Sequence, residues 1–260
     1  MSRGTEWLNA LACGHELPGF PASVKVIDGE LGNRPARYLA VVPAPHNPFP
    51  RARQGEVGLL EGWGLAKAID EAIEADAGGS PRILVAIVDV PSQAYGRREE
   101  ALGIHQALAG AVDAYARARL AGHPLIALLV GKAMSGAFLA HGYQAQRLIA
   151  LDDDGVMVHA MGKAAAARIT LRSIEELESL AATVPPMAYD IASYASLGLL
   201  WDRVKVQSVE QPGAADIAKV NESLARAVLD IGTSTDLRSR LGAPNRAMSS
   251  RVREQLRAQW

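Results

Sequence analysis

Residues 125–138 read LIALLVGKAMSGAF. Leu125–Val130 is a continuous apolar run with β-branched members, which is typical of a strand buried on both faces of a sheet. The residues that follow, from Gly131 to Ala137, are mostly small and lead into a second apolar segment. The pattern therefore predicts a buried strand, a tight loop and a helix that begins at about Gly136.

A similar apolar run, Ile83–Val88, precedes this segment and predicts a second buried strand. Between the two strands we predict a helix from about Arg98 to Leu120, which the Gly-His-Pro sequence at 122–124 ends. A further helix precedes Ile83, because apolar residues recur at four-residue spacing from Leu65 to Ile73. Strand, helix and strand in this order imply a right-handed crossover, a largely parallel sheet and an α/β fold.

The rest of the chain contributes shorter elements. The first 55 residues are rich in turn residues and predict two strands, Val24–Gly29 and Arg37–Val42, before an extended proline-rich loop at 43–50. Downstream we predict strands at 147–151, 156–159 and 202–206, helices at 173–183 and 189–197, and a helical region from 213 with a break at 241–244. We expect residues 1–260 to form a single domain, with 213–260 as a C-terminal helical segment within it.

Composition excludes several classes of protein. The chain has 260 residues, with 27 basic and 28 acidic side chains and a net charge of -1, so it lacks the basic surface of a general nucleic-acid binder. Its apolar runs are far shorter than the ~20 residues that span a bilayer. The single cysteine, Cys13, excludes an internal disulfide framework and a multi-cysteine metal site. We therefore expect a cytoplasmic protein without a metal centre and without nucleic-acid or membrane partners.

The loops that leave the two buried strands are the candidate sites of chemistry. They are Asp89–Gly96 and Gly131–Ala137, and in a parallel sheet both lie at the same edge. Small side chains let a ligand approach the backbone, and the first turn of a helix offers free N–H groups. This arrangement suits an oxyanion hole. The local pattern fits close packing of a helix on a strand at least as well, because short glycine motifs often occur by chance.

Four motifs in one order add a more specific indication: residues 89–96, 99–104, 131–138 and 158–166. The series resembles the C-terminal half of the acyl-CoA carboxyltransferases, a branch of the crotonase superfamily. Within that branch it is most similar to the gamma subunits of biotin-independent malonate decarboxylases. The resemblance covers roughly residues 64–206, and the sequence around Gly29 and at 43–65 extends it toward the N-terminus.

The resemblance implies a crotonase/ClpP-like ββα superhelix with extra N- and C-terminal segments, and an active site shared with a related beta subunit. The expected oxyanion donors are the N–H groups of Gly136 and Ala137. Ser135 stands where many relatives have glycine, so a catalytic role of its hydroxyl is left open. The expected substrate-binding positions are Tyr95, Gly96, Met134, His159, Met161 and Gly162.

The resemblance also implies a reaction, that of a carboxy-lyase. Malonyl-S-acyl-carrier protein would lose CO2 to give acetyl-S-acyl-carrier protein, with the thioester itself as electron sink. No cofactor would be bound directly; the thioester would sit on the phosphoribosyl-dephospho-CoA group of an acyl-carrier subunit. The other partners would be the beta subunit and the acyl-transferase (alpha) subunit. Three candidates for the donor of the final proton stay open: Tyr95, His159 and water.

Two other functions are weighed against this one. A subunit of a biotin-dependent acyl-CoA carboxyltransferase or decarboxylase would use the same oxyanion hole for carboxybiotin. A Clp-type serine peptidase would use Ser135 and His159, because residues 135–138 and 156–159 resemble the serine and histidine motifs of that family. In those peptidases another residue separates the serine from the glycine. The acid of a triad would have to be Asp190, Asp202 or Asp216, none of which lies in a recognisable motif.

Overall fold

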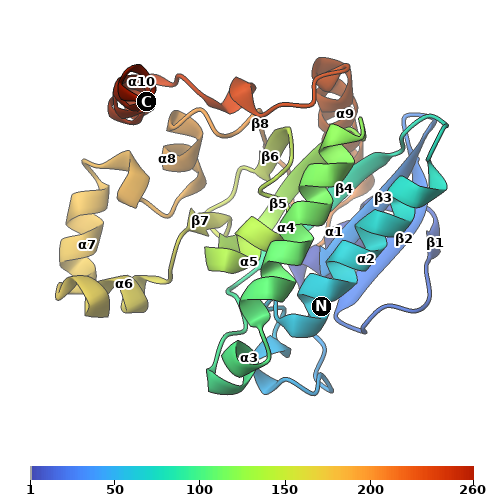
Figure 1. Ribbon diagram of the computed structural model, residues 1–260, viewed down its shortest axis with the longest axis horizontal. Helices are drawn as coiled ribbons and strands as arrows, with labels where there is room; N and C mark the ends of the chain where they lie inside the picture. Colours follow the sequence, from blue (N-terminus) through green and yellow to red (C-terminus); the bar gives the residue numbers. More distant parts are fainter. Residues whose placement is uncertain (1) are drawn as a thin grey trace.

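An eight-stranded sheet lies at the centre of the computed structural model, which describes residues 2–260 (Figure 1). Its order is β1-β2-β3-β4-β5-β6-β8, and β7 pairs with the end of β5. The first two pairs are antiparallel and the later ones are parallel. The strands are β1 (His15–Glu16), β2 (Val24–Leu31), β3 (Arg34–Val41), β4 (Ile83–Val90), β5 (Leu125–Met134), β6 (Arg147–Leu151), β7 (Met157–His159) and β8 (Asp202–Val204).

Helices cover both faces of the sheet. On the face toward the viewer in Figure 1, α2 (Leu59–Ala75) and α4 (Ile104–Leu120) pack side by side. On the other face, α1 (Arg3–Leu11) contacts β3, β4 and β5, and α9 (Ala214–Ile231) contacts β5, β6 and β8. The predicted crossover is confirmed, because α4 connects the parallel strands β4 and β5.

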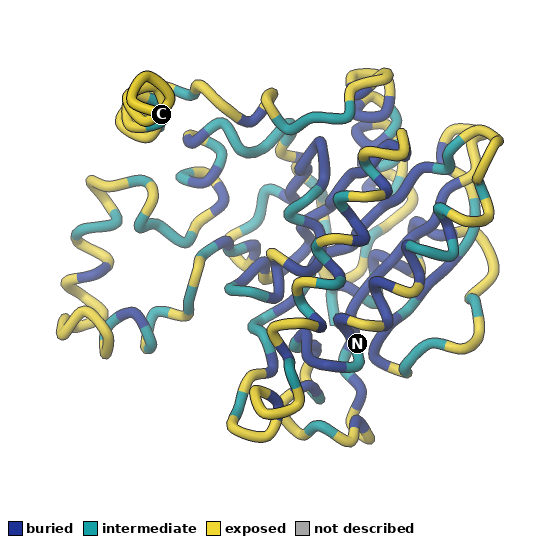
Figure 2. The backbone as a smooth tube through the Cα atoms, in the orientation of Figure 1, coloured by how far each residue is buried: buried dark blue, intermediate teal, exposed yellow. Residues whose placement is uncertain are grey.

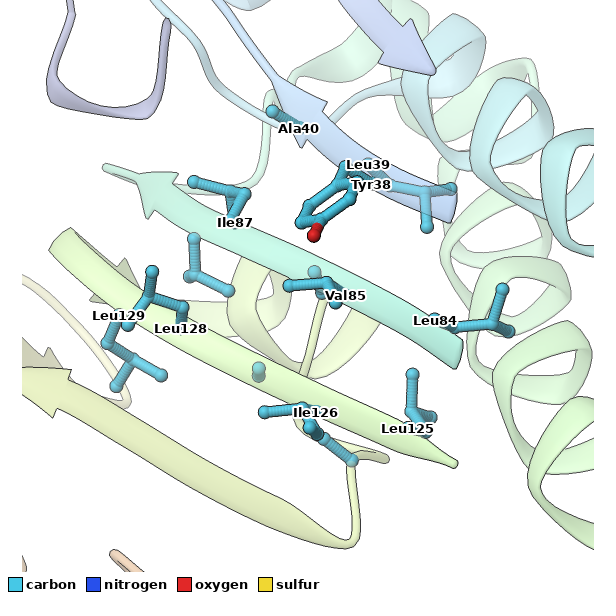
Figure 3. Close-up of a cluster of buried hydrophobic side chains, with 14 of the residues drawn as sticks. Tyr38, Leu39, Ala40, Leu84, Val85, Ile87, Leu125, Ile126, Leu128 and Leu129 are labelled. Atoms are coloured by element: carbon cyan, nitrogen blue, oxygen red, sulfur yellow. The ribbon is translucent and has the colours of Figure 1, made fainter. Parts of the chain in front are cut away.

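The core sits between these layers and around the middle of β4 and β5. Val85, Ile87 and Leu128 have no solvent exposure, and Tyr38 of β3 packs in the same cluster (Figure 3). Ile87 lies opposite Leu128 in the β4–β5 register. Full burial of each such aliphatic side chain stabilises the fold by about 1.5–3 kcal/mol. The two apolar runs therefore fix the layer on which the loops of the site are mounted.

Several element boundaries differ from the predictions. The helix predicted over 98–120 is two helices, α3 (Arg97–Ala101) and α4, because Gly103 takes φ 80, a left-handed conformation that ends the first. The strand predicted to end at Val130 continues to Met134, since its last residues pair with β7. The helix predicted from Gly136 is α5 (Ser135–Ala140) and has only 6 residues.

Sequence reasoning missed α1. The hydroxyl of Ser2 caps this helix by accepting from the N–H of Thr5, and Trp7, Leu8 and Leu11 are its buried face. The indole N–H of Trp7 donates to the carbonyl of Val209 at 2.8 Å. The apolar spacing of this helix is present in the sequence. The helix is short and is followed by turn residues, so the spacing alone does not predict it, and only its packing on the sheet identifies it.

Residues 160–201 and the C-terminus form a peripheral part of the fold that is mostly exposed (Figure 2). It contains α6 (Lys163–Thr170), α7 (Ile174–Ala181), α8 (Ile191–Ser196) and, after a connection over residues 232–246 that includes 3-10 turns, α10 (Ala247–Gln259). The capping box predicted at Ser173 and Glu176 is confirmed at the start of α7, whereas α6 was not predicted. Within residues 2–260, no helix is long and apolar enough to cross a membrane.

Candidate active site

The site lies where β5 gives way to α5. Ser135, the first residue of α5, has φ 62, which is the left-handed region that L side chains with a Cβ rarely adopt. Glycine takes this conformation at no steric cost, which gives a physical reason for the glycine expected there in related sequences. Ser135 keeps the sharp turn from strand to helix at a cost of about 1 kcal/mol.

The two predicted oxyanion donors follow this turn, and they differ in their surroundings. The N–H of Gly136 donates to the side-chain oxygen Oε1 of Gln93 at 2.9 Å. Ala137 is fully buried, and its N–H lies in the first turn of α5, where no carbonyl of the same helix can accept it. One donor therefore already has an acceptor within the chain.

Gln93 is a residue that sequence reasoning did not single out. It belongs to the loop after β4, and its backbone is held by a parallel bridge to Val57. The N–H of Val57 donates to the carbonyl of Ser92 at 3.1 Å, and the N–H of Ala94 donates to the carbonyl of Val57 at 2.8 Å. The loop is fixed on both sides of Gln93, and its half-buried side chain is therefore held at the N–H of Gly136. The sequence did contain a signal for this contact. Gln93 has a side-chain amide and lies in the loop after β4, at the same edge of the sheet as Gly136.

A cavity of about 310 Å³ opens beside Ser135 and Gly136. His159 reaches it because the parallel pairing of β5 and β7 places His159 opposite Met134. Apolar side chains and tyrosines supply most of the remaining lining: Phe138, Leu139, Tyr143, Val158, Pro185, Pro186, Tyr194 and Leu197. The structure thus brings together three of the predicted site residues, Ser135, Gly136 and His159, in one pocket.

The other predicted positions lie around this pocket rather than in its lining. The side chain of Tyr95 is 51% exposed, and Gly96 precedes α3, where an added Cβ would meet Glu99 and Arg51. Met134 is buried directly before α5. Gly162 precedes α6 with open space around it. Met134 pairs with His159 across β5 and β7, and Met161 contacts His159 through its backbone.

That contact orients His159. Its Nδ1 lies 2.9 Å from the carbonyl oxygen of Met161 and 3.2 Å from the amide nitrogen of the same residue, so the backbone of Met161 engages Nδ1, and Nε2 has no partner within residues 2–260. The ring stacks on Tyr189 with centroids 3.9 Å apart and planes 13° apart. Burial lowers the pKa of His159 below its usual range, and the hydrogen bond to Met161 opposes that shift. His159 is therefore neutral near pH 7.

In the described part of the chain, His159 has no acid partner of the kind a serine peptidase needs. The three candidate carboxylates are engaged elsewhere: Asp190 accepts from the N–H of Ser193, Asp202 from Ser223 and Arg226, and Asp216 from the N–H of Gln207. Nδ1 of His159, which an acid would have to orient, is held by a backbone carbonyl instead. Within residues 2–260, His, Cys, Asp and Glu side chains form no cluster that could hold a metal ion.

Comparison with known proteins places this geometry in a family. The sequence profile of the malonate decarboxylase gamma subunit matches residues 52–260. The chain belongs to this family. The gamma-subunit resemblance read from the four motifs is thereby confirmed, and the family is one of enzymes that act on a carboxylate.

Solved structures of malonate decarboxylases are similar over the whole chain. A chain of a Pseudomonas malonate decarboxylase hetero-tetramer, solved in complex with coenzyme A, is 72% identical with a TM-score of 0.97, and the match covers 100% of both chains. A chain of the Pseudomonas MdcD–MdcE hetero-dimer is 69% identical with a TM-score of 0.92, again over 100% of both. Gamma-subunit relatives therefore occur in complexes with other subunits.

A curated relative is the malonyl-S-ACP:biotin-protein carboxyltransferase MADD of Malonomonas rubra. It is 39% identical over 154 residues, which are 58% of this chain and 53% of the relative, so the chain spans about half the length of that protein. The transcarboxylase 12S structure is 19% identical with a TM-score of 0.65 over 87% of this chain and 41% of that one. This last likeness concerns the fold alone and agrees with the predicted crotonase-type carboxyltransferase fold.

Proposed function

We propose that this chain is the gamma subunit of a biotin-independent malonate decarboxylase, which converts malonyl-S-acyl-carrier protein to acetyl-S-acyl-carrier protein and CO2 together with a beta subunit. The match of 72% identity over the full length of a malonate decarboxylase chain carries the proposal. We further propose that the thioester is carried on the phosphoribosyl-dephospho-CoA group of an acyl-carrier subunit, and that an acyl-transferase (alpha) subunit completes the cytoplasmic complex.

The chemistry follows from where charge develops. As the bond between the malonyl Cα and its carboxylate breaks, the electron pair moves toward the thioester oxygen and CO2 leaves. Backbone N–H groups already aimed at this oxygen stabilise the enolate, and each such donor is worth about 3 kcal/mol of barrier. Protonation of the enolate carbon then gives the acetyl thioester.

The N–H groups of Gly136 and Ala137 are the proposed donors. For Gly136 the position of an acceptor is marked by Oε1 of Gln93, 2.9 Å from the nitrogen, which is the distance expected for an oxyanion. The thioester oxygen would replace Oε1 there. A neutral hydrogen bond contributes only about 1 kcal/mol net, and the substrate oxygen restores it, so the exchange costs little.

We propose His159 rather than Tyr95 for the final proton transfer. His159 lines the pocket with Ser135 and Gly136, whereas Tyr95 is 51% exposed. Nε2 of His159 has no partner in the described part of the chain, so it can bind a proton from solvent and then pass that proton to the enolate carbon, which returns the ring to its neutral form. Exchange of His159 for Gln should lower kcat of the decarboxylation in the complex, while Tyr95→Phe should leave it unchanged. The reverse result would assign the step to Tyr95.

The shared site is tested by purifying the chain alone and with its beta partner and assaying decarboxylation of malonyl-carrier protein. Activity should require both chains; full activity of the isolated chain would refute the shared site.

To test the proposed oxyanion donor, Ala137 can be replaced by lactic acid, which removes one N–H and keeps the side chain. We expect kcat to fall about a hundred- to thousandfold. The hydroxy acid of leucine at Leu139, on the same helix, is the matched control.

A biotin-dependent carboxyltransferase is the second candidate, because MADD transfers to a biotin protein. The two reactions differ in the fate of the carboxyl group. In the proposed decarboxylase, CO2 release from malonyl-carrier protein proceeds without a biotinylated carrier and is insensitive to avidin. Turnover only in the presence of biotinylated carrier protein would favour the carboxyltransferase instead.

The organisation of the chain as one carboxyltransferase-like domain over 1–260, with 213–260 as a helical segment within it, is also a proposal. Packing of α9 against β5, β6 and β8 supports it. Limited proteolysis should then remove α10, none of whose residues is buried, without releasing α9. Release of a stable fragment ending near residue 213 would argue for two units.

A further inference from the structure

Arg240 is a buried cation far along the chain from the active-site residues. It ends a short 3-10 turn, Arg238–Arg240, and is 8% exposed. Its Nη1 donates to the carbonyl of Tyr143 at 2.9 Å, and its guanidinium lies 5.0 Å from the centroid of the Tyr143 ring. These two contacts use one face and one nitrogen of a group that carries five N–H donors.

No carboxylate in the part of the chain that the structure describes neutralises this cation. Arg147 and Arg238, its neighbours, form ion pairs with Asp230 and Asp236, but Arg240 forms none within residues 2–260. Burial lowers the pKa of Arg240 below its usual range; Tyr143 and Tyr194 oppose this shift, and the charges of Arg119 and Arg246 add to it. Burial of a charge without a counter-ion is costly. A negative charge from outside the chain would offset that cost.

Arg240 borders a cavity that could receive such a charge. The cavity has a volume of about 160 Å³ and lies at the start of β6, next to the segment that leads into β8. Arg147 and Ser239 also line it. Oγ of Ser239 accepts from Nη1 of Arg147 at 2.9 Å, so the Ser239 hydroxyl hydrogen is free to donate. The pocket beside Ser135 shares none of these lining residues.

We propose that this cavity is a binding site for a small oxyanion of the phosphate type, held by the Arg240 guanidinium and the Ser239 hydroxyl. The planar guanidinium fits two oxygens of a tetrahedral anion at once, which favours phosphate over a spherical anion such as chloride. Arg147 adds positive potential although its own ion pair with Asp230 is complete. The anion is either free phosphate or the phosphate group of a larger coenzyme.

Thermal unfolding of the full chain tests the site. Inorganic phosphate replaces chloride at constant ionic strength, and coenzyme A is used in a second series. A ligand at a hundred times its Kd lowers the unfolded fraction about a hundredfold, so Tm should rise with the logarithm of phosphate concentration. A rise at lower concentration with coenzyme A than with phosphate identifies a coenzyme phosphate group as the ligand; an equal or weaker effect identifies the free anion.

Variants separate this site from general binding to basic side chains. Arg240→Met should abolish the dependence of Tm on phosphate. Arg238→Met is the matched control, because it removes the same charge from a side chain that is 83% exposed, and it should keep the dependence. Should Arg240→Met not fold, Ser239→Ala should weaken the dependence. No effect of either ligand on the wild-type chain, or an unchanged effect in Arg240→Met or Ser239→Ala, would overturn the proposal.

Discussion

The close packing of α2 on α4 makes a stability prediction with a built-in control. Both helices carry a glycine at the contact, Gly62 in α2 and Gly110 in α4. A Cβ added at Gly62 would lie 2.6 Å from the backbone oxygen of Ala107, whereas one added at Gly110 would lie 2.7 Å from Cζ3 of Trp63. The first obstacle is main chain of a packed helix, and the second is a side chain that is 52% exposed.

Two effects set the magnitude of each change. Alanine in place of glycine inside a helix stabilises by about 1 kcal/mol. Overpacking against an obstacle that cannot move costs about 1–3 kcal/mol, so Gly62→Ala, with the helix gain subtracted, should range from neutral to destabilising by about 2 kcal/mol. In Gly110→Ala the Trp63 ring can turn toward solvent, so the helix gain should remain, up to about 1 kcal/mol.

Thermal melts followed by circular dichroism measure the difference. Because about 1 kcal/mol shifts Tm by roughly 2–4 °C in a protein of this size, the difference of about 1–3 kcal/mol should make Gly62→Ala melt about 2–12 °C below Gly110→Ala. Equal melting temperatures for the two variants, or a higher one for Gly62→Ala, would refute the argument that the helix backbones are in contact at Gly62.

Three further predictions concern single side chains. His141 is fully buried between Tyr115 and the carbonyl of Ile87, and burial lowers its pKa to about 4. The folded state therefore requires neutral His141. Its contribution to the free energy of unfolding is fully present above about pH 6.5 and should fall by about 3 kcal/mol as the pH drops toward 4. Urea titrations at several pH values should show a shallower dependence of this free energy on pH in His141→Gln. Gln93→Ala should lower KM of the complex up to about fivefold at unchanged kcat, because the substrate need not displace an internal acceptor; a fall in kcat would show instead that Gln93 assists the reaction. Ser135→Gly should keep kcat and change stability by less than about 1 kcal/mol; a large loss of kcat would give the hydroxyl a catalytic role.

Local features of the sequence determined the framework of the fold. The apolar runs at 83–88 and 125–130 specify buried strands, because a strand covered on both faces needs no polar alternation. Ser173 and Glu176 specify the start of α7, because each satisfies a backbone N–H only three residues away. The order of four motifs was enough to indicate the family.

Tertiary structure alone decided how the site is arranged. Gln93 and Gly136 are 43 residues apart, and their hydrogen bond exists only because β4 and β5 end at the same edge of the sheet. His159 reaches the pocket through its pairing opposite Met134. No local sequence pattern predicts the left-handed conformation of Ser135 or the burial of Arg240. Periodicity and capping act over a few residues and can be read from the chain, whereas these contacts depend on which distant surfaces meet.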